Sequence, residues 1–189
     1  MSKTNETSPS TGLVRASPAP EGYGTVTPWI IARDSGRLID YLRAAFEAEE
    51  IARVLNADGS IGHAEVRIGG SIVMLFDAKE TWPPTPSFLR LYVADADAVH
   101  ARALAAGGTS VTAVTELFFG DKVGRVRDPA GNIWWIQAHV VDVNPTDMGQ
   151  RAADPTFTAA MREVQESLDR EMSARVRPDA ASPRSLPMP

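Results

Sequence analysis

Two stretches of the chain follow one pattern and decide the fold: VTPWIIARDSGRLIDYLRAAF at residues 26–46 and FLRLYVADADAVHARALAAGG at residues 88–108. Each begins with an apolar strand pattern and continues into a helix pattern introduced by an aspartate. A second pair, EVRIGGSIVMLFDA at 65–78 and VGRVRDPAGNIWWIQAH at 123–139, indicates two strands joined by a glycine-containing turn. A shift of 61 residues, without an insertion, aligns Thr27 with Phe88, Asp34 with Asp95, Gly70 with Gly131 and Met74 with Trp135.

This internal repeat predicts an α+β fold made of two tandem βαβββ modules, at residues 24–78 and 87–140 of a domain spanning 24–141. A repeated unit that cannot bury its face alone packs against its copy. We therefore expect a curved mixed sheet with a concave cleft, in which function would lie. The pattern places helices at 36–47 and 95–106, and strands at 25–32, 49–55, 61–68, 71–77, 87–93, 110–115, 122–128 and 132–138.

The segments outside the repeat are predicted to be two tails and one helix. Residues 1–22 are rich in Ser, Thr and Pro and, like residues 176–189, have the composition of a disordered tail. Residues 154–174 are predicted to form an amphipathic helix, because one apolar stripe recurs at helical spacing. The stripe consists of Phe157, Met161, Val164, Leu168 and Met172.

Composition restricts the partners and the compartment. The 189 residues carry a formal net charge of −5, which favours neither nucleic acid nor an anionic membrane surface. Without cysteine there are no disulfides, thiolate metal ligands or cysteine nucleophiles. No apolar run approaches the ~18 residues of a membrane span, and the N-terminus lacks the apolar core of a signal peptide. We therefore expect a cytoplasmic protein that binds neither nucleic acid nor membrane.

Four stretches together resemble the vicinal oxygen chelate superfamily of glyoxalases, bleomycin-resistance proteins and dioxygenases, and within it the PhnB-like branch. They are VTPWI, IGHAEVRIGGSIVMLFD, LYVADADAVHARALAAGG and FFGDKVGRVRDPAGNIWWIQAH, in this order. The resemblance covers nearly all of residues 24–141 and neither the tails nor the C-terminal helix. It implies a homodimer and a site in the concave cleft. Because one fold hosts many activities, the resemblance leaves the activity open.

The resemblance also implies where a metal would bind, on the opening and closing strands of each module. The matching positions are Thr27, Met74, Phe88 and Trp135. None of these side chains is the imidazole or carboxylate that a divalent metal prefers. We therefore expect no metal and no other cofactor.

Strand alternation predicts which side chains line the cleft instead. The expected ligand-binding residues are mostly aromatic, with few polar groups, as in a small-molecule pocket. They are Thr27, Trp29, Met74, Phe76, Phe88, Arg90, Tyr92, Trp135 and Gln137, with Phe118 and Phe119 in a neighbouring loop. A flat aromatic molecule would stack on these rings, and Arg90 would pair with a carboxylate or stack. The alternative is that the rings pack on one another as core, and that the two loop phenylalanines anchor their loop rather than cover the cleft.

His63 and Glu65 form the best acid–base pair by composition, with Tyr92 as a further proton-transfer candidate. Alternation puts His63 and Glu65 on one face of their strand, yet the repeat aligns His63 with Gly124, so the facing stays open. A surface pair without catalytic function is the alternative. His100 and His139 are expected to be solvated.

Arg125 and Arg127 are expected to form ordinary ion pairs with Asp121 and Asp128.

Three functions remain open from the sequence. The first is a metal-independent homodimer that binds or sequesters a planar hydrophobic molecule, in the manner of resistance proteins. The second is a metal-free isomerase, cyclase or lyase acting on a natural product. The third is a protein-interaction module whose cleft is occupied, for example by its own helix 154–174.

Overall fold

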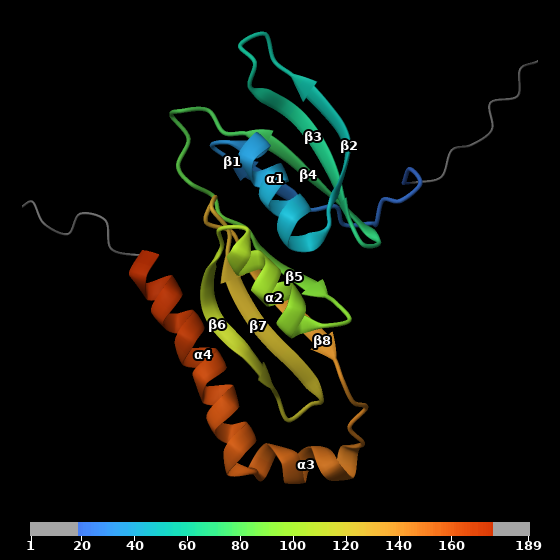
Figure 1. The fold of residues 1–189 in the computed structure, drawn as a ribbon, viewed down its shortest axis with the longest axis vertical. Helices are drawn as coiled ribbons and strands as arrows, with labels where there is room; N and C mark the ends of the chain where they lie inside the picture. The colour runs from blue at the N-terminus through green and yellow to red at the C-terminus, as the bar shows by residue number, and fades with distance from the viewer. Residues whose placement is uncertain (1–18, 176–189) are drawn as a thin grey trace, which may run out of the picture.

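The computed structural model describes residues 19–175 and confirms the paired modules (Figure 1). The first module contains β1 (Trp29–Ala32), α1 (Ser35–Phe46), β2 (Glu49–Leu55), β3 (Ile61–Ile68) and β4 (Ser71–Asp77). The second contains β5 (Phe88–Tyr92), α2 (Ala96–Ala105), β6 (Thr109–Glu116), β7 (Asp121–Arg127) and β8 (Ile133–His139). Two helices follow, α3 (Pro145–Ala153) and α4 (Pro155–Arg175). Residues 1–18 and 176–189, which hold most of the predicted tails, lie outside the described part.

Each module forms its own four-stranded sheet. The strand order is β1-β4-β3-β2 in the first, called sheet A here, and β5-β8-β7-β6 in the second, called sheet B. The opening strand pairs in parallel with the closing strand, and the other pairs are antiparallel. No strand pairing joins the two sheets within residues 19–175. The curved sheet expected from the sequence is therefore divided in two, and β1 and β5 are edge strands.

Both module helices begin at the predicted aspartates. The Asp34 carboxylate accepts a hydrogen bond from the Arg37 main-chain N–H at 2.8 Å, and the Asp95 carboxylate accepts one from Ala98 at 3.0 Å. Each bond satisfies an N–H that the first helical turn leaves without a partner. The strand predicted at 25–32 begins only at Trp29, because Pro28 has no N–H for the ladder.

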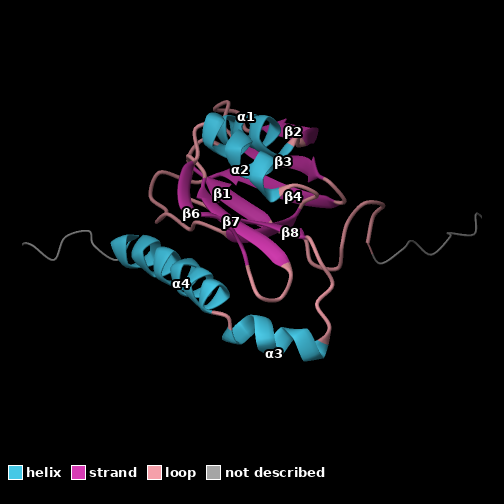
Figure 2. Ribbon diagram, turned by 60° about the horizontal axis from the view of Figure 1, so that its bottom comes forward, coloured by secondary structure: helices cyan, strands magenta, loops and turns pink. Residues whose placement is uncertain are grey.

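The core lies between the sheets and these two helices, which pack against each other over the same side of the molecule (Figure 2). The strand residues that face the helices are buried, as alternation predicts: Ile30, Val66 and Leu75 in sheet A, and Val126, Trp134 and Ile136 in sheet B. Phe46 of α1 meets Trp134 of β8 with ring centroids 4.9 Å apart, which joins the two modules. The opposite faces of the two sheets carry the candidate functional residues, and we call them the open faces.

The two hairpins differ by one residue, which corrects the expectation of a repeat without insertions. Arg67 pairs with Ile72 across the first hairpin, whereas Arg127 pairs with Ile133 across the second. Four residues separate the first pair and five the second. The longer connection exists because the Asp128 carboxylate accepts hydrogen bonds from the main-chain N–H groups of Ala130 and Asn132. Glu65 is therefore equivalent to Arg125, and His63 to Val123, which resolves the conflict in the sequence alignment.

Candidate ligand-binding faces

Four ring side chains follow one another across the open face of sheet A, and we call them the aromatic row: His63, Trp29, Phe76 and Trp82. Ring centroids lie 5.6 Å apart for Trp29 and His63, 5.4 Å for Trp29 and Phe76, and 6.1 Å for Phe76 and Trp82. The rings meet tilted or edge-on, so π faces remain available to a ligand. Trp29 is 47% exposed and Trp82 37%, unlike the core rings of the same module.

Trp82 was missed by the sequence interpretation, which treated residues 79–86 as a stiff linker. Arg33 fixes this linker: its guanidinium donates to the main-chain carbonyls of Lys79, Glu80 and Trp82 at 3.0, 2.8 and 2.7 Å. The Lys79 ammonium lies 5.7 Å from the centroid of the Trp82 ring. A tryptophan between Thr81 and two prolines was the only signal available in the sequence.

The polar groups of the open face of sheet A are His63 and Glu65, which do share one face of β3. Their neighbours Ala64 and Val66 are fully buried on the other face. His63 Nε2 lies 2.8 Å from Glu65 Oε1. Hydrogen bonding from the Tyr23 hydroxyl, and then from His63, lowers the pKa of the Glu65 carboxyl. Hydrogen bonding to Glu65, and then burial, raises the pKa of the Tyr23 hydroxyl. Glu65 is therefore an ionised acceptor that orients both partners. Tyr92 is on β5 of the other sheet, so the structure does not bring it into this cluster.

The open face of sheet B carries a cross-strand row of opposite character, which we call the arginine row. Strand register aligns Arg90 of β5, Trp135 of β8, Arg125 of β7 and Thr112 of β6 side by side. The Arg90 guanidinium carbon lies 4.5 Å from the Trp135 ring centroid, and that of Arg125 lies 4.0 Å from it. Phe88 contacts Trp135 edge-on at 6.3 Å and is 48% exposed.

Helix α4 lies along β6 and covers part of this face (Figures 1 and 2). Buried Val164 packs against Leu117 and Val123. The Ser167 and Thr112 hydroxyls are 2.7 Å apart. The Arg175 guanidinium donates to the Gly131 carbonyl at 2.8 Å. The chain's own helix thus occupies part of the predicted lining in the second module, whereas α4 makes no such contact with sheet A.

The predicted ion pairs of Arg125 and Arg127 with Asp121 and Asp128 are wrong. Arg127 pairs with Glu171 of α4 at 3.1 Å. Arg125 is only 2% exposed and donates to the Thr112 hydroxyl at 3.0 Å and to the Val164 carbonyl at 2.6 Å, both uncharged acceptors. Its burial, and then the charge of Arg90, lower the pKa of Arg125 to about 10. Short-range sequence patterns could not reveal α4 as the partner, because it lies about 40 residues away in the chain.

Gln137 belongs to a network at the end of β8 and is buried. Its side-chain amide donates to Asp121, whose other carboxylate oxygen lies 2.6 Å from Nδ1 of His139. His139 Nε2 lies 2.9 Å from the Asp142 carboxylate. The hydrogen bonds to Asp121 and then to Asp142 raise the pKa of the His139 imidazole. Gln137 is therefore held away from the open part of the face.

Contacts in the structure also concern the loop phenylalanines and His100. The rings of Phe118 and Phe119 pack edge-on, with centroids 5.3 Å apart. The Arg151 guanidinium of α3 donates to the Phe118 main-chain carbonyl at 2.8 Å. The contacts favour an anchored loop over a cover for the cleft. His100, expected to be solvated, is instead buried against the sheet, with Nε2 3.3 Å from the Ser110 hydroxyl.

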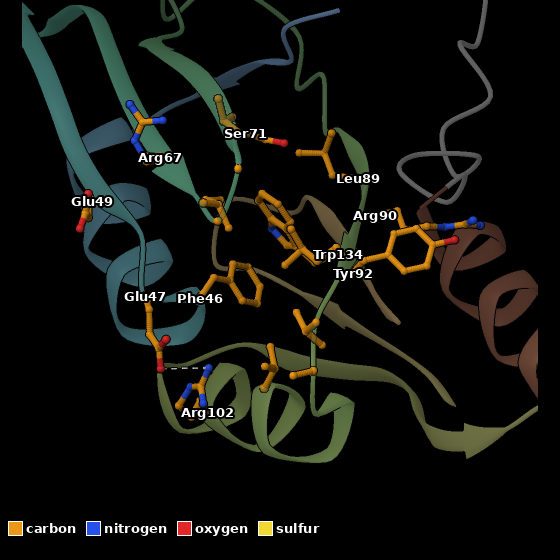
Figure 3. A pocket seen from close by; sticks show the side chains of 18 of the residues that line it. Phe46, Glu47, Glu49, Arg67, Ser71, Leu89, Arg90, Tyr92, Arg102 and Trp134 are labelled. Carbon is orange, nitrogen blue, oxygen red and sulfur yellow. Dashed lines mark ion pairs between the residues drawn. The ribbon is translucent and has the colours of Figure 1, made fainter. Parts of the chain in front are cut away.

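A cavity with a volume of about 810 Å³ lies between the modules (Figure 3). Its walls are the end of α1, the β3–β4 turn, the start of α2 and strand β5. Of the predicted site residues, only Arg90 and Tyr92 border it, and their side chains point away from its apolar centre (Figure 3). Arg102 and Glu47 pair across its rim at 3.3 Å. The cavity and the two open faces are thus different places.

The donor set at the family's metal positions does not fit a divalent cation. Thr27, Met74, Phe88 and Trp135 offer a hydroxyl, a thioether and two hydrocarbon rings with one N–H donor. Within residues 19–175, no three His, Asp or Glu side chains are grouped so that they could hold a metal.

The chain belongs to the Glyoxalase/Bleomycin resistance protein/Dioxygenase superfamily, whose family model matches residues 23–136. The expected resemblance is confirmed, because this match includes both modules in their tandem order. No helix in the described part of the chain is long and apolar enough to cross a bilayer.

Similar proteins leave the activity of this chain open. An uncharacterized protein of Mycobacterium tuberculosis, Rv0887c, is 38% identical over 130 residues, which are 63% of this chain and 76% of the relative. The structure of TioX from Micromonospora sp. ML1 is 26% identical, with a TM-score of 0.52 over 64% of this chain and all of TioX. A PhnB protein from Bacillus cereus is 16% identical, with a TM-score of 0.48 over 61% of this chain and 99% of that protein.

Proposed function

We propose that this protein binds a planar, hydrophobic small molecule on the open face of sheet A, without the metal of the family's enzymes. The observation that carries the proposal is the aromatic row, in which Trp29 and Trp82 are exposed at opposite sides of Phe76. Natural chains seldom leave two tryptophans exposed in one patch without a partner for them. Sequestration or resistance is the functional type that fits binding without chemistry.

The magnitudes require a polar anchor beside the rings. Two stacking contacts contribute ~1–3 kcal/mol in total. Burying ~200 Å² of apolar ligand surface adds ~5 kcal/mol. Association costs at least ~4 kcal/mol, so rings alone give roughly millimolar binding. Glu65 and His63, 2.8 Å apart beside Trp29, are the groups that would add affinity and orientation.

Binding is tested by saturable quenching of tryptophan fluorescence with a panel of flat aromatic compounds. Because a removed ring takes its stacking and its contact area with it, Trp29→Ala and Trp82→Ala should each weaken the best compound about five- to tenfold. The matched control is Leu104→Ala on α2, since Leu104 is exposed to the same extent as Trp82 but lies away from the aromatic row. Saturable binding that survives both tryptophan substitutions would place the ligand elsewhere.

We further propose that the protein acts as a homodimer. Edge strands β1 and β5 both carry exposed aromatic side chains: Trp29 is 47% exposed, Phe88 48% and Tyr92 66%. An apolar strand edge left open is a template for pairing with another chain. A second copy is the simplest partner, because it brings the same complementary edges.

A second candidate function is metal-free catalysis by His63 and Glu65. The 2.8 Å contact and the ionised carboxylate, which fixes the imidazole orientation, are the arrangement of a base and its orienting group. Native mass spectrometry of protein from its own host would identify a bound compound. If catalysis occurs, the wild type converts that compound and His63→Gln binds it without conversion. If the wild type and His63→Gln bind the compound equally and neither converts it, the protein binds without catalysing a reaction.

A further inference from the structure

The arginine row of sheet B concentrates positive charge that the described residues do not neutralise. Arg90 and Arg125 both lie against Trp135, and no carboxylate comes within 4.0 Å of either guanidinium in residues 19–175. Two carboxylates on β7 and α4 have other partners: Asp121 binds His139, and Glu171 binds Arg127 and Arg175. Two positive charges in a partly buried environment of low dielectric repel each other, and a bound anion would relieve this repulsion.

The polar atoms of this row are also incompletely satisfied. Arg125 Nε and Trp135 Nε1 are buried N–H donors without a hydrogen-bond partner. Arg125 is 98% buried, since 2% of it is exposed. Such unpaired buried groups are rare in folded proteins and each requires a reason. Excess donors and excess positive charge in one place point to an acceptor that carries negative charge.

Strand β5 gives this charge an open approach. Phe88, Arg90 and Tyr92 alternate onto one face of β5, and all three are exposed. Neighbouring side chains on one face of a strand are about 7 Å apart, so the three span about 14 Å. We call them the β5 strip. An aromatic ring can lie against Phe88 or Tyr92 while an oxyanion on that ring reaches Arg90.

We propose that the β5 strip, backed by Trp135 and Arg125, is a binding site for planar aromatic anions, with Arg90 as the residue that contacts a carboxylate, sulfonate or phosphate group. Arg90 supplies the paired donors that match the two oxygens of such a group. Arg125 acts at a distance, because its guanidinium is held by Thr112 and by the Val164 carbonyl of α4. This site is separate from the aromatic row of sheet A and does not depend on the function proposed there.

Two fluorescent probes of nearly equal shape test the site on the full-length protein. 8-Anilinonaphthalene-1-sulfonate carries an anion, and N-phenyl-1-naphthylamine is its neutral counterpart. We expect the sulfonate to bind at least about tenfold more tightly, and this preference to fall at high salt. Arg90→Gln should remove the preference while leaving the neutral probe unchanged. Arg37→Gln on α1 removes the same charge from an exposed position outside both sheets and should change neither probe.

Each outcome decides between the sites. Loss of the sulfonate preference in Arg90→Gln, with Trp29→Ala retaining it, supports the site. Equal affinity of the two probes in the wild type, or a preference that Arg90→Gln retains, overturns it, even if Trp29→Ala weakens the neutral probe and so supports the function of sheet A. Melting curves of the variants, compared with the wild type, check that the fold is intact.

Discussion

At the scale of single residues, Asp128 explains why the second hairpin has the shape it has. Its carboxylate is 3% exposed and accepts four hydrogen bonds. The donors are the main-chain N–H groups of Ala130 and Asn132 at 2.9 Å, and the Asn132 amide and the Trp134 indole N–H at 2.8 Å. One side chain therefore fixes the turn, the start of β8 and the core tryptophan.

Asp128→Ala is expected to destabilise the protein by about 3 kcal/mol, because it leaves several buried donors without an acceptor. Asp58→Ala is the matched control: Asp58 also bonds its own turn, through Ser60, but is exposed, so we expect a loss below about 1 kcal/mol. Urea unfolding followed by circular dichroism measures both. Equal losses would show that the turn aspartate contributes only locally.

Residue-level prediction from the sequence succeeded where the chemistry is local. Aspartates that begin helices, and the side-chain alternation of His63 and Glu65, depend on neighbours within a few positions. Trp82 and Tyr23 were missed because their place is set by Arg33 and Glu65, far away in the chain. Trp82 lies in a linker and Tyr23 lies between the predicted tail and the predicted domain, where no periodicity could place them.

At the scale of elements, the repeat predicted ten strands and helices within a few residues of their bounds, and α3 was the one element missed in the described part. Helix α3 has no buried residue, and Met148 is its only large apolar side chain, so its sequence offers no apolar stripe that reveals a helix. Helix α4 was predicted from such a stripe, and the structure shows what the stripe contacts. Val164 is the stripe's most buried member, and buried Ser167 adds a polar contact to β6.

We expect Val164→Ala to weaken the docking of α4 on sheet B. The substitution removes two methyl groups from a site that is 2% exposed, which costs about 1.5 kcal/mol. If α4 opens as a unit, its amides should then exchange with solvent about tenfold faster.

Hydrogen exchange followed by mass spectrometry measures this effect, with Gln165→Ala on the exposed side of the same helix as the control. Amides of β8 should keep their protection in both variants. Faster exchange in α4 and β8 alike would instead mean that the helix and the sheet unfold together.

At the scale of the whole molecule, the duplicated modules have diverged in opposite directions. Equivalent positions hold Trp29, Met74 and Glu65 in sheet A but Arg90, Trp135 and Arg125 in sheet B. One open face is thus aromatic with an acid, and the other is cationic and partly covered by a helix. The repeat predicted the strands and helices that the two modules share. It could not predict this difference between the open faces, because α4 lies outside the repeat. The aromatic contacts of the open faces form separate clusters, one around Trp29 on sheet A and one around Trp135 on sheet B.

The unpaired edges of β1 and β5 could join two copies of the chain into a homodimer. If β5 pairs in this way, a change at its free edge should weaken the dimer. The main-chain groups of Ser87 and Val93 bond β8, so those of Phe88, Arg90 and Tyr92 point toward the free edge of β5. Tyr92→Pro removes one N–H from that edge without breaking the β5–β8 ladder. We expect the wild type to sediment as a dimer and Tyr92→Pro to sediment as a monomer. Tyr92→Ala, which removes the same ring but keeps the N–H, should remain more dimeric than the proline variant. A monomeric wild type would contradict pairing through β5. A Tyr92→Pro variant that remains a dimer would contradict it too, and would show that the dimer uses another surface.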